Sequence, residues 1–167
     1  LQLQQLEKVR QSLVRIAAME KDETDNRRSV RSAEERSALA EADVAEAMNI
    51  HDAKEQEMLY AEEEVRDHLQ SRPGFWSRLF RRPAAKTWIA EHEERRKLVK
   101  QRKDELKESS KLLQHYQDTQ VKAAADLQKV QAALQKITRK LSSLKEELKV
   151  PLASIGPHLI DHQFFQQ

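Results

Sequence analysis

The chain has 167 residues, of which 35% are charged and 5% aromatic, and its formal net charge at pH 7 is +2. The absence of cysteine excludes a disulfide framework, and two glycines and four prolines are too few for the many tight turns of sandwiches, barrels and doubly wound sheets. Gly74 and Gly156 lie too far apart to form a glycine-rich phosphate loop. The composition is typical of long charged helices.

Proline and glycine divide the chain into segments. Residues 1–71 and 85–149 contain neither residue type, so each can form one long helix. Pro73 and Pro83 mark the connection between the two runs, and Pro151 follows the second. We therefore predict an all-α fold: a long antiparallel coiled-coil helical hairpin with a basic and aromatic tip and a short C-terminal tail. The expected boundaries are 1–71 for the first arm, 72–87 for the tip, 88–149 for the second arm and 150–167 for the tail.

The first arm carries a weak heptad pattern. Its best register contains Val9, Ile16, Glu23, Val30, Ser37, Val44, His51, Met58 and Val65. Its companion register contains Leu6, Leu13, Met48 and Leu69, with charged residues between them. Seven alanines add small apolar surface, namely Ala33, Ala40, Ala42, Ala45, Ala47, Ala53 and Ala61.

The first arm also contains a wholly polar stretch at residues 20–29. Within it Thr24, Asp25 and Asn26 favour helix caps over helix interiors. The arm therefore either breaks near 24–28 or continues through the stretch as a solvated helix.

The connection between the arms concentrates cations and aromatic rings. Residues 72–88 contain five cations and no acid, and since the whole chain carries +2, the rest of it carries −3. The segment also holds both tryptophans, Trp76 and Trp88, and two of the four phenylalanines. The candidate nucleic-acid-binding residues are Arg72, Arg78, Arg81, Arg82, Lys86 and Trp76.

Three interpretations of this segment stay open. In the first, its apolar side chains pack onto the ends of both arms as a structural cap, and Pro83 begins the return helix. These side chains are Phe75, Trp76, Leu79 and Phe80. In the second, the arginines contact phosphates of DNA or RNA and an exposed ring stacks on a base. In the third, the tip docks on a protein or on a membrane surface, of which we expect the membrane less.

The second arm has the stronger heptad pattern. One register contains Val99, Leu106, Leu113, Gln120, Leu127, Leu134, Leu141 and Leu148. Its companion contains Tyr116, Ala123, Val130, Ile137 and Leu144. An apolar repeat of seven residues maintained over this length predicts a left-handed coiled coil.

The two arms are unequally apolar where they meet. Folding the hairpin at the tip sets the polar stretch 20–37 opposite 119–136. The apolar residues of that second segment are Val121, Leu127, Val130 and Leu134. We expect them to form a partner interface, covered by a second copy of the chain or by the body of a longer parent protein. Alternatively, Val30, Ala33 and the alkyl stems of nearby arginines cover them.

Other candidates for chemistry are weak. His158 and His162 are four residues apart and could share a metal ion on a helix, but no third ligand accompanies them, so we expect no metal and no cofactor. A two-helix hairpin has little interior for an active site, so we expect no enzyme activity. No apolar run approaches the ~20 residues that span a bilayer. Together with the lack of cysteine, this favours a cytoplasmic protein.

The ends of the chain predict a piece of a longer protein. The sequence begins at Leu1, within an apolar repeat, and the tail 150–167 is rich in apolar residues. We expect this tail to leave the coiled coil and either to pack back on a helix or to lead into the core of a parent protein.

Two segments resemble a known family. Residues 73–80 read Pro-Gly-Phe-Trp-Ser-Arg-Leu-Phe and are followed by Trp88, and residues 161–165 read Asp-His-Gln-Phe-Phe. Both are similar to segments of the coiled-coil stalk insertion in bacterial superfamily 1 helicase-like ATPases. The resemblance covers the tip and tail only, and neither a Walker lysine loop nor an acidic metal motif is present. It implies a non-catalytic accessory arm that contacts nucleic acid or a partner beside the motor.

The competing interpretation is a structural or adaptor coiled coil. Such a protein would mediate protein association or oligomerisation and would have no nucleic-acid role. The two interpretations differ in what the tip binds.

Overall fold

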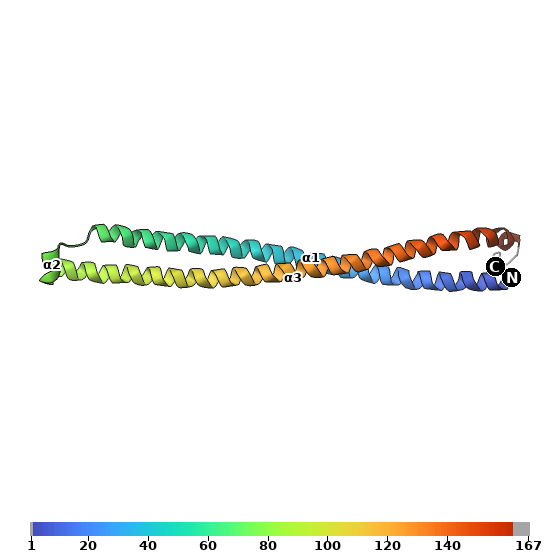
Figure 1. Cartoon of the computed structure of the whole chain (residues 1–167), viewed down its shortest axis with the longest axis horizontal. Coiled ribbons are helices and arrows are strands. Elements are labelled where there is room, and N and C mark those ends of the chain that lie inside the picture. Colours follow the sequence, from blue (N-terminus) through green and yellow to red (C-terminus); the bar gives the residue numbers. More distant parts are fainter. Residues whose placement is uncertain (1, 162–167) are drawn as a thin grey trace. The chain divides into compact units, whose positions relative to one another are not determined.

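The computed structural model of the chain describes residues 2–161, which form three helices and their connections (Figure 1). Helix α1 runs from Gln2 to Gln70, α2 from Phe75 to Leu79 and α3 from Pro83 to Asp161. The long helix α1 packs against the long helix α3, and no strand occurs among the described residues. The predicted all-α helical hairpin is confirmed.

The two long helices contribute to two compact units. The terminal unit combines α1 up to Ser37 with α3 from Ala123 onward, and the tip unit comprises Ala38–Lys122. Helix α2 and both of its connections belong to the tip unit.

Helix α1 is continuous through its polar stretch, so the break considered near 24–28 does not occur. Three short polar side chains there bond back to carbonyl oxygens of the preceding turn. Thr24 Oγ1 donates to Glu20 O at 2.9 Å, Asn26 Nδ2 to Asp22 O at 2.8 Å and Ser29 Oγ to Asp25 O at 3.1 Å. These side chains therefore use helical backbone acceptors instead of ending the helix.

The apolar core of the terminal unit follows the predicted registers. Val9 and Ile16 of α1 are buried with Leu141 and Leu148 of α3, and Met19 and Leu144 pack against this cluster. All four buried residues belong to the main heptad registers of the two arms.

The companion register predicted for α1 is wrong, because a stripe of alanines faces inward instead. Ala33 in the terminal unit and Ala40, Ala47 and Ala61 in the tip unit are all buried, the least covered at 5% exposure. The predicted Leu6, Leu13, Met48 and Leu69 are between 41% and 52% exposed.

The physical reason lies in the residues between those leucines. Continuing the heptad from Leu6 and Leu13 would turn Glu20, Arg27 and Glu34 inward, and burying these charges is costly. The alanine register instead brings small side chains to the interface, where they allow the helix backbones to approach closely.

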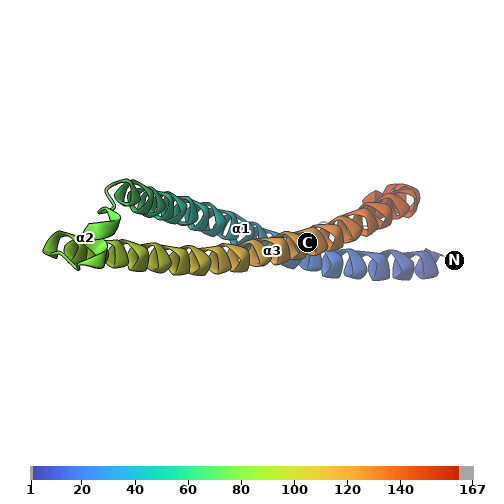
Figure 2. The ribbon, with the colours of Figure 1, turned by 60° about the vertical axis from the view of Figure 1, so that its left-hand side comes forward.

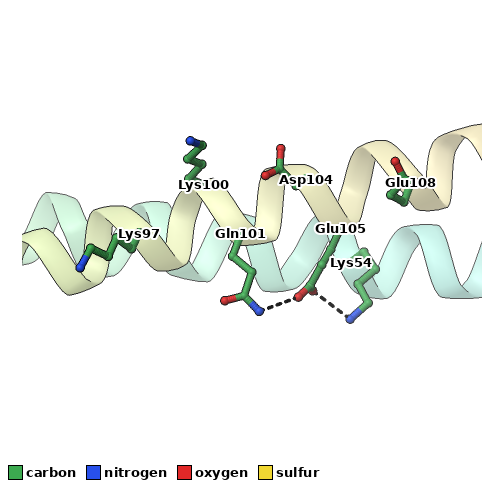
Figure 3. A pocket seen from close by; sticks show the side chains of 7 residues that line it. All are labelled: Lys54, Lys97, Lys100, Gln101, Asp104, Glu105 and Glu108. Carbon is green, nitrogen blue, oxygen red and sulfur yellow. Dashed lines mark hydrogen bonds and ion pairs between the residues drawn. The ribbon is translucent and has the colours of Figure 1, made fainter.

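A layer of four charged side chains joins α1 and α3 within the tip unit. Lys54 Nζ lies 3.2 Å from Glu105 Oε2, and Arg102 Nη1 lies 2.9 Å from Glu57 Oε2. Arg102 also contacts Glu105 at 2.9 Å. Gln101 donates to the same carboxylate at 3.0 Å, and Figure 3 shows this bond beside the contact with Lys54. These hydrogen bonds, with Arg102 contributing most, hold the pKa of Glu105 at about 2. A polar layer with mutually satisfied charges favours one register of the two helices.

Helix α3 continues beyond the expected end of the second arm at 149 and includes Pro151. A proline removes one backbone donor, so the carbonyl of Glu147 loses its helical partner. Glu147 is exposed, which leaves this carbonyl near solvent. The tail is therefore helical as far as Asp161, and residues 162–167 lie outside the described structure. Whether the tail leaves the coiled coil stays a prediction.

The alanine stripe predicts an asymmetry between two neighbouring alanines. Replacing buried Ala40 with leucine should lower the free energy of unfolding by about 1–3 kcal/mol, because the larger side chain forces the helices apart. The matched change Ala42→Leu, on the exposed side of α1, should stay within about 0.5 kcal/mol of the original protein. Urea unfolding followed by circular dichroism measures both. Equal effects of the two substitutions would contradict the inward position of the stripe.

Candidate functional site

Three stacked rings close the hairpin where α1 ends and α3 begins. The indole of Trp88 is nearly parallel to the imidazoles of His68 and His92, with centroid distances of 4.9 and 4.8 Å. The two imidazoles are 5.4 Å apart, whereas rings on opposite faces of an indole would be separated by at least about 7 Å. Both histidines therefore lie side by side on the same face of Trp88.

Hydrogen bonds fix this stack to the end of α1. Trp88 Nε1 donates to His68 O at 3.2 Å and to Ser71 Oγ at 3.3 Å. His68 Nδ1 and His92 Nδ1 are 3.2 Å apart, so one of them carries the proton and the other accepts it. His68 Nε2 also lies 3.4 Å from Glu91 Oε2. This arrangement has room for one proton between the two rings.

The surroundings of His92 disfavour its charged form. Burial is the largest cause of its lowered pKa, followed by the neighbouring His68 and by the cations Arg96, Arg72 and Arg95. His92 is therefore held in its neutral form, and its Nδ1 shares a hydrogen bond with Nδ1 of His68.

Beyond the stack, α2 forms a single helical turn at the joined end of the hairpin (Figures 1 and 2). The turn ends in two backbone hydrogen bonds, from Arg81 N to Arg78 O and from Arg82 N to Ser77 O, each 3.2 Å long. This pattern needs a left-handed residue at position 81, where glycine is usual. Arg81 occupies it with φ of 48°, and it has the only positive φ at a non-glycine residue in the part of the chain that the structure describes.

The apolar side chains of the tip are exposed, so the structural-cap interpretation is wrong. The exposed fractions are 62% for Phe75, 66% for Trp76, 56% for Leu79 and 66% for Phe80. The end of the hairpin is already filled by Trp88 with its two histidines and by Ala85, which is 1% exposed. The beginning of the return helix at Pro83, which belonged to the same interpretation, is confirmed.

The exposed rings of α2 and of Phe80, which follows it, pack on one another. Trp76 and Phe80 are nearly parallel with centroids 6.0 Å apart, and Phe75 meets Trp76 edge-on at 5.4 Å. The three rings thus form one aromatic surface that is open to solvent.

The tip that carries this surface also carries the predicted cations, which have no acidic partners among the described residues. Arg72, Arg81, Arg82 and Lys86 are exposed and Arg78 is half-buried. None of the five forms an ion pair with another residue that the structure describes. The Nε of Arg78 is buried and finds no acceptor among the described residues. The tip therefore presents uncompensated positive charge beside aromatic rings.

The four residues predicted as a partner interface belong to two units and differ in exposure. Val121 belongs to the tip unit and is 69% exposed. Leu127, Val130 and Leu134 belong to the terminal unit and are half-buried on the heptad seam. In that unit α1 carries Ala33, which is buried, and Val30, which is half-buried, as the alternative interpretation expected.

Sequence reasoning missed two groups of residues that contain histidine. His68 and His92 lie 24 positions apart, and only the register of the hairpin brings them together. The second group is His51, Asp52 and Glu55, whose ligand atoms lie within 4.8 Å of one another. Both carboxylates are exposed, and His51 Nε2 lies 3.1 Å from Ser110 Oγ. The side chains of His158 and His162 lie outside those that the structure describes.

Comparison of the chain with protein-family models, with curated proteins and with solved structures gives no match. Within residues 2–161, no helix combines the length and the apolar character that a bilayer span requires. We therefore infer the function of the chain from the geometry of its tip.

The burial of His92 beside other cationic groups predicts a pH-dependent stability. The pKa of His92 in the folded protein lies below its usual value of 6.5, so the unfolded chain binds the proton more tightly. Stability should be complete above about pH 6.5 and fall as the pH drops further, which thermal unfolding between about pH 7.5 and about pH 5 measures. His92→Gln should remove this part of the pH response. His115→Gln, a change outside the stack, should retain it, and equal pH responses of the two variants would refute the assignment.

Proposed function

We propose that the chain is a non-catalytic coiled-coil arm of a larger protein and that its tip binds nucleic acid without sequence preference. The observation that carries the proposal is the exposure of three aromatic rings beside five cations that have no acidic partner in the described structure. A protein that used these rings only to close its coiled coil would bury them.

The cations supply the electrostatic part of binding. Four of the five are arginines, whose planar forks match the oxygens of a phosphate. Residues 72–88 contain no acid, so the positive charge is not neutralised locally. Each phosphate contact releases counterions, and binding of this kind weakens steeply as salt rises.

The aromatic surface supplies the stacking part of nucleic-acid binding. Bases of any identity can stack on an exposed ring, and such stacking contributes roughly 1–3 kcal/mol per base. Trp76 and Phe80 offer two nearly parallel rings on one helical turn. No described element is shaped to present side chains to base edges in a groove, so this mode favours unstacked bases over particular sequences.

Two local features support a binding role for the arginines. Arg81 adopts a left-handed conformation that an arginine reaches only at an energetic cost, and such strain is found where function requires a particular side chain. Arg78 keeps Nε buried without an acceptor, which is also costly. If the side chain of Arg78 moved so that Nε donated to a phosphate oxygen, this donor would no longer be unsatisfied.

A membrane surface is the less favoured partner for the tip. The helical turn from Phe75 to Leu79 has five residues, whereas helices that lie in the lipid interface bury a much longer apolar face. Binding to anionic vesicles is nevertheless a result that the experiment below can return.

The proposal also concerns the larger protein to which the arm would belong. The similarity of residues 73–80 and 161–165 to a stalk insertion supports the proposal that the arm acts beside a helicase-like motor in the cytoplasm. The motor body, or a second copy of the chain, would be the partner along 119–136, where Val121 is exposed.

The adaptor alternative has one observation in its favour. Leu3, Leu13 and Val14 of the terminal unit are exposed on α1, at 82%, 48% and 64%. Exposed apolar side chains of this kind suit protein association. This alternative requires no contribution from the tip.

The proposal predicts salt-sensitive binding that depends on the tip arginines. With three to five phosphate contacts, affinity for a labelled single-stranded oligonucleotide should fall by about one to two orders of magnitude between about 50 and about 200 mM salt. Changing Arg78, Arg81 and Arg82 together to glutamate should abolish binding at low salt. Fluorescence anisotropy with single- and double-stranded oligonucleotides measures both effects.

The control has the same charge change in the terminal unit. Lys8, Arg15 and Lys21 are exposed, and their joint change to glutamate should leave most of the affinity intact. Equal binding by the original protein and the tip variant would contradict the proposal. Binding to anionic vesicles without binding to oligonucleotides would favour the membrane instead.

A further inference from the structure

A second basic surface lies in the tip unit, between α1 and α3. A depression of about 540 Å³ is lined by α1 around residues 62–69 and by α3 around residues 96–103. We call it the basic groove. Val65 and Val99 contribute apolar side chains to it, and its charged residues are Glu62, Arg66, Arg96, Lys100 and Lys103.

The side chains that line the basic groove carry more positive than negative charge. Lys103 Nζ pairs with Glu62 Oε1 at 2.8 Å. Arg66, Arg96 and Lys100 form no ion pair with other described residues, so four cations against one acid leave a charge of +3 on its lining.

A neighbouring depression, lined by Lys54 of α1 and by residues of α3, shows that this surplus is not general. Lys100 lines it as well as the basic groove, but three acids balance three cations there (Figure 3). Its charged residues are Lys54, Lys97, Lys100, Asp104, Glu105 and Glu108. Lys54 is bonded to Glu105, and Lys97 is bonded to Glu94 at 3.1 Å. Cations that are held by acids in this way attract an external anion weakly. The surplus of the basic groove is therefore a local feature.

The basic groove lies close to the tip along both helices. Arg66 lies four residues before the end of α1 at Gln70, which is about 6 Å of helix, and Arg96 follows Pro83 by thirteen residues, which is about 20 Å. A single strand of roughly 4–16 nucleotides, the range covered by single-strand-binding surfaces, can reach across such a distance. Leu69, at the groove and 45% exposed, offers apolar surface on this path.

We propose that a single-stranded polynucleotide bound at the tip continues into the basic groove, where Arg66, Arg96 and Lys100 contact its phosphates. This proposal rests on the proposed function of the tip, and it specifies single-stranded nucleic acid as the ligand. A flexible strand can follow a narrow groove between two helices, whereas a duplex carries its phosphates on a stiff, convex surface. A flat bilayer that touches the end of the hairpin would leave the groove unused.

The experiment compares short and long oligothymidylates of about 4 and about 16 nucleotides. The groove variant changes Arg66, Arg96 and Lys100 to glutamate, and the control is the terminal-unit variant of Lys8, Arg15 and Lys21, which alters the net charge equally. The original protein should bind the longer strand about tenfold or more tightly, because the groove adds phosphate contacts. The groove variant should bind the short strand almost normally and lose most of the gain from length.

Each outcome decides one claim. A gain from length that persists in the groove variant, or is lost equally in the control, overturns the groove path while leaving the tip as a binding site. Failure of the original protein to bind either strand overturns the proposed function itself. A second groove variant with glutamine at the three positions checks the result without introducing acids, and it should lose about half or more of the gain.

Discussion

The stacking of Trp88 on His68 and His92 is the interaction from which the character of the tip follows. It joins the last turn of α1 to the first turns of α3 and fills the end of the hairpin. Because this space is taken, the rings of α2 cannot pack there and remain in solvent. The two tryptophans of the chain thus have opposite roles: Trp88 stabilises the hairpin, and Trp76 is available to a partner.

Charge pairing separates the structural surfaces of the tip unit from its candidate binding surfaces. Between the helices, Lys54, Glu57, Arg102 and Glu105 satisfy one another and fix the register. The tip cations have no such partners among the described residues, and in the basic groove only Lys103 is paired, with Glu62. Pairs exposed to water contribute little to stability, so leaving these cations unpaired costs the fold little. The charge is then available for a polyanion.

Much of the fold could be predicted from residue patterns, and the errors have specific causes. The absence of proline and glycine from the arms and the leucine repeat of α3 predicted the hairpin, and Pro83 predicted where α3 begins. The companion register of α1 was wrong because leucines were given more weight than Ala40 and Ala47, although the leucine series would have buried charges. For the site, composition located the cations, but whether Trp76 or Trp88 closes the hairpin depends on a contact with His68 across 20 positions.

The most direct test of this account is fluorescence quenching of each tryptophan alone. Trp88→Phe leaves Trp76 as the only emitter, and Trp76→Phe leaves Trp88. We expect acrylamide to quench Trp76 efficiently in the free protein, and a single-stranded oligonucleotide at low salt to change its emission while that of Trp88 stays unchanged. A Trp76 that is shielded in the free protein, or whose emission does not respond to nucleic acid, would contradict the account.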